Sequence, residues 1–480
     1  MISCCTKEEG NGGGAGTLII IGGGSAAFAA ATRAVELGVE KVTMINDGLP
    51  TGGTCVNVGC VPSKTLLRAA ESLHRANHNP FDGIETSGHL TDFSAIMEQK
   101  RRLVADLRQA KYVDVISHLP QVRLVRGHAK LLDAHTVEIS KARLTADHIL
   151  IATGASAAIP EIPGLAGAGY LTNESAFELE SLPESLLVLG GRYIALECAQ
   201  MFARLGSRVT ILQRSGRILP VESEDITAAL TGYLADEGIE VVAGAAMEQV
   251  RRDNQGVVAA AKINGQRMEF SATQLLVAAG RKPNTRGMGL DQIGMELDER
   301  GFIKVGPTLQ TTIPGVWAAG DVIGEPMFVY TAAYEGALAA ENALTKADRL
   351  ADYTALPWVI FTDPQVAGVG LDEKQARDKG LEPDTAVLPL RHVPRAIAAR
   401  DTRGFIKLIR DRKTDLLLGA RILAPEGSEL LMEAALAIKF GITVRQIRES
   451  FHPYLTLGEG MKLAAIAFGK DPARLSCCAT

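Results

Sequence analysis

Two pairs of closely spaced cysteines are the residues of this sequence whose spacing most directly predicts chemistry. Cys477 and Cys478 are adjacent, close to the end of the sequence. Their Cα atoms must lie about 3.8 Å apart, whereas relaxed disulfides join Cα atoms that are roughly 4.4–6.8 Å apart. We therefore expect this pair to favour the dithiol, which is a good ligand for a soft, thiophilic metal ion.

The second pair, Cys55 and Cys60 in the segment GTCVNVGCVPSK, is expected to be a redox centre. The residues that follow are typical of a helix, and a helix N-terminus lowers the pKa of a thiol and favours the reactive thiolate. Lys64 lies four residues after Cys60 and therefore on the same helical face, where a cation fits beside an electron-accepting ring. The two pairs together indicate that a soft species is caught at one pair and reduced at the other.

The elements that must position these residues follow a strand-turn-helix pattern. Residues 17–37 predict an apolar strand, a glycine turn and an alanine-rich helix, and residues 42–46 predict the next strand. This is the opening βαβ unit of a dinucleotide-binding fold, and it is repeated over residues 186–213. A long helical stretch is expected at about 92–118. From about residue 350, strands and helices alternate as in an α+β module.

The first glycine turn, Gly22 to Ala27, has the pattern G-x-G-x-x-A. Gly22 permits the tight turn, Gly24 lets the backbone approach a pyrophosphate at the helix N-terminus, and Ala27 allows close packing of helix on strand. An acidic residue that holds a ribose is expected at the end of the second strand. Asn46 stands there and Asp47 follows it, so either side chain is a candidate for this hydrogen bond.

The second glycine turn, Gly190 to Ala195, departs from the pattern because Arg192 replaces its second glycine. Its second strand ends at Gln213 and Arg214, with Arg217 close behind. No acidic residue is there to bind a ribose 2′-hydroxyl, and arginine suits a 2′-phosphate. The sequence thus favours NADPH over NADH, although both arginines could also be ordinary surface residues.

Length and composition set the class of protein. The chain has 480 residues, 46% of them hydrophobic and 22% charged, which indicates a globular protein of about three domains. Its net charge of −5, without a basic cluster, argues against a nucleic-acid partner. Residues 17–31 are too short and too glycine-rich to span a membrane, no signal peptide is evident, and residues 1–16 are expected to form a flexible tail.

Seven cysteines are too few for a disulfide scaffold of this size and favour reactive chemistry in a reducing cytoplasm. Cys198 lies in a helical run and is expected in the core, as buried cysteines often are. The adjacent residues Cys4 and Cys5 are either an auxiliary metal-binding pair or incidental thiols.

On these motifs, the chain resembles the pyridine nucleotide–disulfide oxidoreductases over about residues 17–478. The resemblance implies an α/β fold with two Rossmann-like domains, for FAD and NADPH, and a C-terminal α+β dimerisation domain. It places the FAD-binding domain at 17–157 and 280–347, the NADPH-binding domain at 158–279, and the dimerisation domain at 348–480.

The resemblance also implies roles for individual residues. Cys55 would be the exposed interchange thiol and Cys60 the thiolate against the flavin, with Lys64 near the flavin and paired with Glu197. Tyr193 would gate the nicotinamide pocket. The residues expected to bind the two cofactors are Gly22, Gly24, Ala27, Asn46, Asp47, Thr54, Lys64, Thr153, Gly154, Gly190, Glu197, Gln213, Arg214, Gly280 and Asp321, the last at the ribityl chain.

Two features favour the mercury(II)-reducing branch of this family. One is the Cys477–Cys478 pair. The other is Tyr454, which stands where the disulfide-reducing relatives carry a catalytic histidine when Thr456 and Glu459 are matched to their motif. Thiol–disulfide exchange needs a base that titrates near neutrality, whereas metal reduction needs thiolates and electrons more than a proton shuttle. The neighbouring His452 is either a base or a surface or dimer-interface residue.

The expected reaction carries electrons from NADPH through FAD to Cys55 and Cys60, which reduce Hg(II) to Hg(0). Cys477 and Cys478 of the partner subunit in a homodimer would take Hg(II) from thiol complexes and deliver it, while Tyr193 and Tyr454 would orient it. The expected metal ligands are thus Cys55, Cys60, Cys477 and Cys478. The alternatives are a thioredoxin-reductase-like enzyme with a C-terminal dithiol relay, and a flavoprotein that sequesters the metal without turnover.

Overall fold

The computed structural model describes residues 15–474, and the chain divides into two compact units. The first unit is formed by residues 1–62, 101–156 and 281–351, and the second by residues 63–100, 157–280 and 352–480, each as far as it is described. Two boundaries between the units fall inside helices, α3 (Cys60–Asn77) and α4 (Phe93–Arg108). A third lies in the short strand β8 (Ala155–Ala157).

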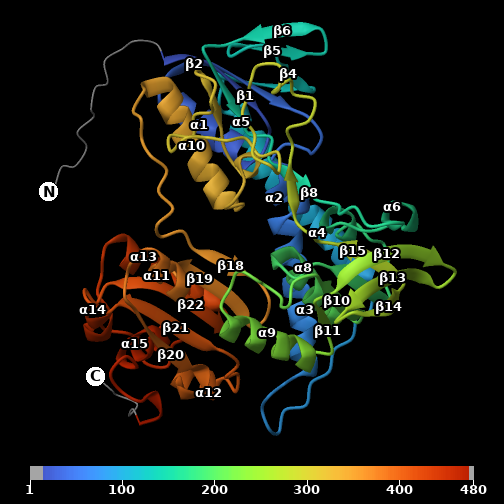
Figure 1. Cartoon of the computed structure of the whole chain (residues 1–480), viewed down its shortest axis with the longest axis vertical. Helices are drawn as coiled ribbons and strands as arrows, with labels where there is room; N and C mark the ends of the chain where they lie inside the picture. The colour runs from blue at the N-terminus through green and yellow to red at the C-terminus, as the bar shows by residue number, and fades with distance from the viewer. Residues whose placement is uncertain (1–14, 475–480) are drawn as a thin grey trace. The chain divides into compact units, whose positions relative to one another are not determined.

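A five-stranded parallel sheet in the order β17-β7-β1-β2-β3 forms the centre of the first unit (Figure 1). Helices α1 and α10 pack side by side on this sheet so closely that a Cβ on Gly336 would lie 2.0 Å from the Ala26 carbonyl oxygen. The bounds are β1 (Ala15–Ile21), β2 (Val39–Asn46), β3 (Val122–Arg126), β7 (His148–Ile151), β17 (Val316–Ala318), α1 (Ser25–Glu36), α2 (Gly53–Val58) and α10 (Val329–Thr345).

Smaller elements complete the first unit. Strands β4 (Ala129–Leu131), β5 (Thr136–Ile139) and β6 (Ala142–Thr145) form an antiparallel sheet. Helix α4 continues into a π-helical turn, Gln109–Val113, and then into α5 (Asp114–Ser117). The remaining short elements are β16 (Arg281–Pro283) and a 3₁₀ turn, Asp321–Ile323.

The second unit contains a four-stranded parallel sheet in the order β11-β10-β9-β15. Its central strand β9 is buried along its whole length, as expected for a parallel strand with both faces covered. An antiparallel sheet, β12-β13-β14, adjoins it. The bounds are β9 (Ser185–Leu189), β10 (Arg208–Gln213), β11 (Glu240–Ala243), β15 (Gln274–Val277), β12 (Ala246–Asp253), β13 (Gly256–Ile263), β14 (Gln266–Ala272), α6 (Leu165–Ala168), α7 (Asn173–Ala176), α8 (Tyr193–Leu205) and α9 (Glu224–Asp236).

The same unit carries a five-stranded antiparallel sheet in the order β18-β19-β22-β21-β20. Helices α13 and α15 cover it and share its core. The bounds are β18 (Trp358–Ile360), β19 (Gln365–Gly370), β20 (Pro383–Pro389), β21 (Phe405–Asp411), β22 (Leu417–Ala424), α11 (Glu373–Asp378), α12 (Pro394–Ala398), α13 (Gly427–Lys439), α14 (Val444–Glu449) and α15 (Glu459–Ile466).

The predicted α/β class, with two strand-turn-helix units and a C-terminal α+β module, is confirmed by this architecture. Cys60 is the first residue of α3, which contains the helical segment that was expected after it, while Cys55 lies in a separate short helix, α2. Gly59, with φ −123° and ψ −107°, breaks the two helices apart.

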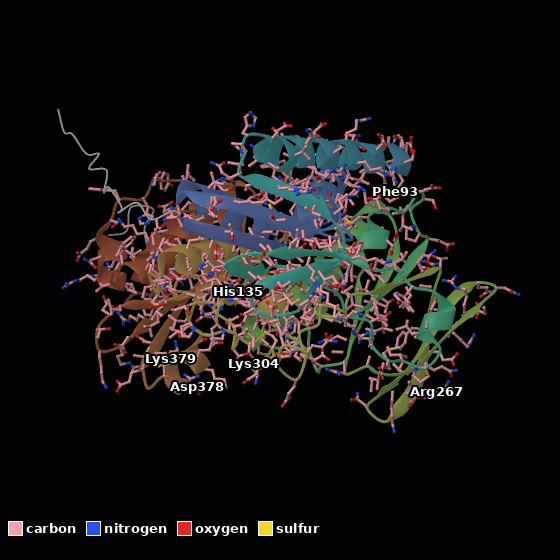
Figure 2. The ribbon with its side chains drawn as sticks, turned by 90° about the horizontal axis from the view of Figure 1, so that it is seen from above. Phe93, His135, Arg267, Lys304, Asp378 and Lys379 are labelled. Atoms are coloured by element: carbon pink, nitrogen blue, oxygen red, sulfur yellow. The ribbon has the colours of Figure 1, made fainter. Side chains whose placement is uncertain are left out.

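Charged side chains such as Arg267 and Lys304 lie on the exposed surface (Figure 2). Within residues 15–474, no helix combines the length and the apolar character needed to cross a membrane.

Candidate active site

The first glycine turn sits where β1 ends and α1 begins. Gly22 has φ +140°, and a Cβ at this position would lie 2.2 Å from the Ala152 carbonyl oxygen, so only glycine fits. Gly53 has φ +62°, and its Cβ would lie 2.6 Å from the Gly24 Cα atom. The turn and the N-terminus of α2 therefore touch backbone to backbone.

The N-terminus of α1 has the properties of a phosphate-binding site. Gly24 is its N-cap residue and no described side chain caps the helix, which leaves amide groups of its first turn for an anion. At the end of β2, the Asn46 amide donates to the Leu49 carbonyl oxygen at 2.9 Å and so holds the loop. The Asp47 carboxylate is 60% exposed and lies 3.3 Å from His128, which makes it the more accessible of the two ribose candidates.

The two cysteines of the redox motif are both partly buried, Cys55 in α2 and Cys60 at the start of α3. The buried Asn57 lies between them, and its Nδ2 atom is within hydrogen-bonding distance of the carbonyl oxygens of Pro50 (3.0 Å), Thr51 (3.3 Å) and Gly53 (2.8 Å). Its Oδ1 atom accepts from Arg108 of α4 at 3.1 Å. These contacts tie α2, which carries Thr54 and Cys55, to the preceding backbone and to α4.

The π-helical turn brings Tyr112 to this motif. Its ring packs edge-on against Phe28 of α1, with centroids 4.8 Å apart, and a Cβ on Gly52 would lie 3.0 Å from it. Burial raises the pKa of the Tyr112 hydroxyl, a hydrogen bond with Ser25 lowers it, and the charges of both redox cysteines raise it further. A π-helical turn inside an α-helix is frequent at functional sites, and here it puts a phenol beside the redox pair.

A half-buried acid, Asp321 at the start of the 3₁₀ turn, faces a half-buried base, Arg281 of β16. Burial raises the pKa of Asp321, and the charge of Arg281, whose Nε atom is 3.6 Å away, opposes this effect. The Arg281 Nε atom is buried without a hydrogen-bond partner among the described residues. A polar cofactor group such as a ribityl hydroxyl fits this pair, because it would satisfy both side chains.

The Thr153–Gly154 turn is bonded to Asn284. The Thr153 hydroxyl donates to the Asn284 carbonyl oxygen at 2.8 Å, and the Asn284 amide N–H donates to the Gly154 carbonyl oxygen at 3.0 Å. These two hydrogen bonds hold the turn in place next to the strands that carry the cofactor motif.

The second glycine turn repeats the geometry of the first in the other unit. Gly190 has φ +126°, and its Cβ would lie 2.3 Å from the Ala278 carbonyl oxygen. Arg192 stands where the pattern has its second glycine. It fits there because it is the N-cap residue of α8 and its backbone is extended, with φ −108° and ψ −170°. Gln213 is buried beneath the turn, where a Cβ on Gly191 would lie 3.1 Å from its side chain. The departure from the glycine pattern thus leaves the turn intact.

Arg214 and Arg217 follow β10 and are both exposed. The Arg217 guanidinium donates to the carbonyl oxygens of Pro220 (3.3 Å) and Glu222 (2.9 Å). A pocket opens beside this loop and is lined by Ser215, Gly216, Arg217, Pro220, Glu224, Thr227, Ala228 and Thr231. Arg217, and not Arg214, therefore lines this pocket.

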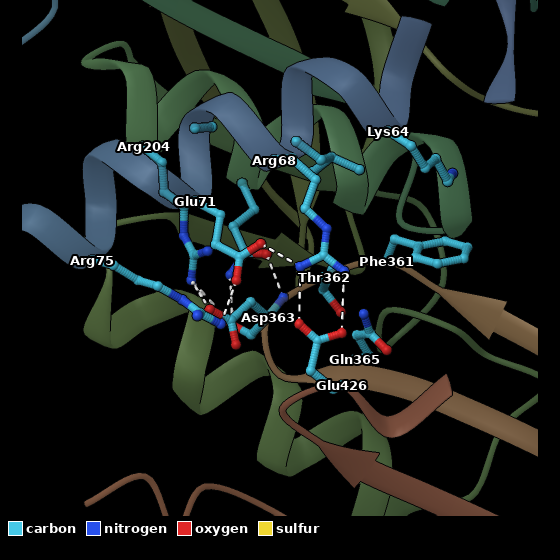
Figure 3. A pocket seen from close by; sticks show the side chains of 13 residues that line it. Lys64, Arg68, Glu71, Arg75, Arg204, Phe361, Thr362, Asp363, Gln365 and Glu426 are labelled. Carbon is cyan, nitrogen blue, oxygen red and sulfur yellow. Dashed lines mark hydrogen bonds and ion pairs between the residues drawn. The ribbon is translucent and has the colours of Figure 1, made fainter. Parts of the chain in front are cut away.

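Lys64 and Glu197 form an ion pair of 2.6 Å, with the Glu197 side chain 9% exposed. The other Glu197 oxygen accepts the Phe361 amide N–H at 3.0 Å, and the Lys64 ammonium lies 4.5 Å from the centroid of the Phe361 ring. Figure 3 shows Lys64 and Phe361 at one end of a pocket whose other end is closed by ion pairs around Arg68, Arg204 and their acidic partners. The pair that the sequence predicted is thus formed, and it is anchored to the backbone of a distant segment.

The segment between α14 and α15 contains the two candidate residues of the C-terminal domain, His452 and Tyr454, which differ in their exposure. His452 is nearly buried, and its Nε2 atom lies 2.8 Å from a Glu433 carboxylate oxygen. Tyr454 is 53% exposed. Glu459 accepts the Leu455 amide N–H at 3.2 Å, which holds the loop in shape. Of these two candidates, Tyr454 is therefore the one accessible to a ligand or to a partner.

Several predicted residues are not tested by this geometry. Cys477, Cys478, Cys4 and Cys5 lie outside the described residues. Within residues 15–474, no three or more His, Cys, Asp or Glu side chains gather as a metal-binding cluster. Gly280 has φ +138° and accepts the Ala158 amide N–H at 2.9 Å, so its site is a backbone turn.

Three residues of these sites were missed by the sequence analysis, namely Tyr112, Arg281 and Phe361. Arg281 had a signal, because it is a charged residue that directly follows the apolar run LLVAAG. The other two had none, since their importance comes from contacts with residues far away in the sequence.

Comparisons with known proteins agree with this geometry. The family described as pyridine nucleotide-disulphide oxidoreductase matches residues 16–336, and the dimerisation domain of the same family matches residues 356–465. A mercuric reductase of Bacillus cereus is 46% identical over 94% of this chain and 71% of its own length. A mercuric reductase of Streptomyces lividans is 46% identical over 94% of this chain and 96% of its own length.

Solved structures with the same fold have lower identity. The flavoprotein disulfide reductase RclA from Escherichia coli, in a Cu(II) complex, has a TM-score of 0.84 at 29% identity over 94% of this chain and 99% of its own. LpdA from Mycobacterium tuberculosis has a TM-score of 0.82 at 28% identity, again over 94% of this chain and 99% of its own.

Proposed function

The chain belongs to the pyridine nucleotide-disulphide oxidoreductase family, and on this premise we propose that it reduces Hg(II) to Hg(0) with electrons from NADPH. Its cofactors are FAD and NADPH, as in the family. The observation that carries the choice of substrate is Tyr454, half exposed on its loop, where a disulfide reductase needs a histidine base. The relatives named mercuric reductase, 46% identical over 94% of the chain, support the same choice.

The first unit would hold FAD and the turn at Gly190 would hold NADPH. The N-terminus of α1 would bind the FAD pyrophosphate, Asp47 its ribose, and Asp321 with Arg281 the ribityl chain, which explains the buried Nε atom without a partner. When bound, the two cofactors supply a pair of electrons as hydride. Lys64, held by Glu197, would place a positive charge beside the reduced ring and so stabilise it.

The cysteines perform the metal chemistry. Hg(II) favours two thiolates, and Cys55 and Cys60 would displace the carrier thiols by ligand exchange, one sulfur at a time. Two electrons then convert the bound Hg(II) to Hg(0), which no longer binds thiolate and leaves. The net reaction is Hg(II) + NADPH → Hg(0) + NADP⁺ + H⁺.

Delivery of the metal would use Cys477 and Cys478 of the partner subunit in a homodimer. The family's dimerisation domain supports this assembly. The outer face of α13 presents Met432, Leu436 and Phe440, which are 53%, 48% and 70% exposed, and Phe451 nearby in sequence to Tyr454 is fully exposed. We infer that this apolar surface lies in the dimer, and that the thiol-complexed Hg(II) of a reducing cytoplasm is the substrate.

The test is NADPH oxidation by the purified yellow protein, with Hg(II) in excess thiol and separately with a disulfide substrate. We expect strong stimulation by Hg(II), loss of volatile mercury, and little disulfide turnover. The variant Cys60→Ser should abolish the reaction, and Cys198→Ala, which alters only a buried thiol, is the matched control. Stimulation by the disulfide alone would contradict the proposal and identify a dithiol relay of the thioredoxin-reductase type, whereas stoichiometric binding without NADPH oxidation would identify sequestration.

Substitution of the tail cysteines tests delivery separately. Cys477→Ala with Cys478→Ala should lower turnover with bulky Hg(II)–dithiol complexes more than turnover with small complexes. Full activity of this double variant on the bulky complexes would refute the relay.

A further inference from the structure

Tyr193 rests on an aromatic side chain that the proposed mechanism does not use. Its ring lies parallel to that of Trp358 in β18, with a ring-to-ring angle of 10° and centroids 6.1 Å apart. Such stacking stabilises one position of a side chain. Tyr193 is the first residue of α8, so this contact sets where the tyrosine stands at the mouth of the second dinucleotide site.

The Trp358 ring is in turn supported by its neighbours in the antiparallel sheet. It pairs with Gly368 across β18 and β19, and Gly368 pairs with Arg421 across β19 and β22, so the three residues form one row across the sheet. A Cβ on Gly368 would lie 2.4 Å from the Trp358 ring, which leaves room for the indole only because this residue is glycine. The Arg421 guanidinium lies 5.6 Å from the Trp358 ring centroid, a cation–π contact.

The guanidinium that supports the indole is itself fixed. The Arg421 side chain is 3% exposed, and its Nε atom lies 3.1 Å from a Glu222 carboxylate oxygen. Its other nitrogens donate to the carbonyl oxygens of Val369 at 3.0 Å, Ala420 at 2.9 Å and Gly370 at 3.3 Å. Every contact of Arg421 therefore depends on the sheet or on Glu222.

Glu222 connects this row to the arginine loop. Its carboxylate binds Arg421, while its backbone carbonyl oxygen accepts from Arg217 at 2.9 Å. Arg217 lines the pocket beside β10. These contacts thus form one continuous series from Arg217 through Glu222, Arg421 and Trp358 to Tyr193.

We propose that Trp358 is a positioning residue that holds Tyr193 at rest, and that this series releases Tyr193 when a 2′-phosphorylated adenosine nucleotide occupies the Arg217 pocket. The proposal rests on the NADPH preference in the proposed function. A phosphate dianion is a stronger acceptor for a guanidinium than a backbone carbonyl. It therefore draws Arg217 away from the Glu222 carbonyl, loosens residues 220–222, and weakens the support that Glu222 and Arg421 give to the Trp358 ring.

The fluorescence of Trp358 reports this event directly. The chain has two tryptophans, and Trp317→Phe leaves Trp358 as the single tryptophan of the FAD-loaded enzyme. We expect saturating adenosine 2′,5′-bisphosphate, which lacks the nicotinamide, to shift the Trp358 emission to longer wavelength, and adenosine 5′-monophosphate at matched occupancy to leave it unchanged. In Trp317→Phe/Glu222→Gln, which keeps the shape and the backbone carbonyl, the shift should fall to less than half.

Each outcome of this measurement decides the proposal. An unchanged emission with calorimetrically confirmed binding of the bisphosphate, or an equal shift in the Glu222→Gln background, would overturn it. Absence of bisphosphate binding would overturn it together with the NADPH preference, without bearing on Hg(II) reduction. A failure of Hg(II) reduction would leave the emission response as it is, so the two proposals fail separately.

A second variant tests the resting position of Tyr193 by kinetics. Trp358→Leu removes the ring under Tyr193, so the KM for NADPH should fall by about two- to tenfold, the range that corresponds to one aromatic stacking contact, while kcat changes little. Trp358→Phe keeps a ring and should restore most of the original KM, and Trp317→Phe is the matched control. An unchanged KM in Trp358→Leu, or no rescue by phenylalanine, would refute the positioning role.

Discussion

Cys198 provides a quantitative test of how strongly burial suppresses the reactivity of a thiol. It lies in the middle of α8 and should take no part in the metal chemistry. Burial raises its pKa to about 12, with a further contribution from the charge of Glu197, against an ordinary value of 9.0. At any pH below 9 its thiolate fraction is then about a thousandfold lower than that of an ordinary thiol. Its side chain is also 2% exposed, which restricts access independently.

The assay is competitive alkylation of the native protein, reduced beforehand with a phosphine. Iodoacetamide is added at pH 8, the reaction is stopped at intervals, and the unfolded chain is labelled with the heavy isotopologue for peptide mass spectrometry. We expect Cys198 to be modified at least a thousandfold more slowly than the same residue in the unfolded chain. Modification within tenfold of Cys55 would refute the reasoning from burial, and it would add a fifth thiol to the four that are expected to bind Hg(II).

Three further predictions concern packing, the exposed loop and titration. Gly336→Ala puts a Cβ 2.0 Å from the Ala26 carbonyl oxygen, so it should destabilise by about 3 kcal/mol or more and release FAD at lower temperature in a flavin-fluorescence melt. Its control, Gly232→Ala in α9, meets no atom within 4 Å and should stabilise by ~0.5–1 kcal/mol; equal melting of the two variants would contradict the packing argument. Tyr454→Phe should lower Hg(II) turnover without changing the melting temperature, because the side chain is 53% exposed, and unchanged turnover would exclude a role for its hydroxyl. Burial lowers the pKa of His74 from 6.5 to about 4, so between these two values only the unfolded state gains a proton. The free energy of unfolding should therefore fall as the pH drops from 6.5 to about 4. His74→Gln should reduce this fall, as measured by urea unfolding at several pH values, and an unaltered pH dependence would assign the loss of stability to other groups.

The two dinucleotide-binding turns illustrate what the sequence could predict. A buried apolar strand, a glycine that must adopt positive φ and an alanine-rich helix are all local properties, so the elements from β1 to β2 and from β9 to β10 were expected at the residues where they occur. The pairing of Lys64 with Glu197, 133 residues apart, was predicted as well. That prediction came from the resemblance to the family and not from any local pattern.

The contacts of Tyr193 could not be predicted from local sequence patterns. Trp358 follows it by 165 residues, in a strand whose sequence PWVIFT predicts only its own conformation. The contact is decided by the register of β18 on β19 and by a glycine that leaves space for an indole, and neither property is visible in one segment. The π-helical turn at Gln109–Val113 was hidden for a similar reason, because the predicted helix over 92–118 has no residue that marks an extra residue in one turn. Tyr112, which lies in this turn, packs on Phe28, a residue far away in the sequence.

The position of Asn57 has a consequence for how the redox motif can vary. The Asn57 amide lies within hydrogen-bonding distance of three carbonyl oxygens that precede it in the sequence, those of Pro50, Thr51 and Gly53, and its oxygen accepts from an arginine of another helix. An insertion or deletion of one residue between Gly53 and Asn57 would move the amide out of reach of these carbonyl oxygens. The number of residues from Pro50 to Asn57, a stretch that includes Cys55, is therefore fixed, whereas the identities of its outward-facing residues are open to exchange. Libraries that aim to retune this centre should vary side chains and keep the number of residues constant.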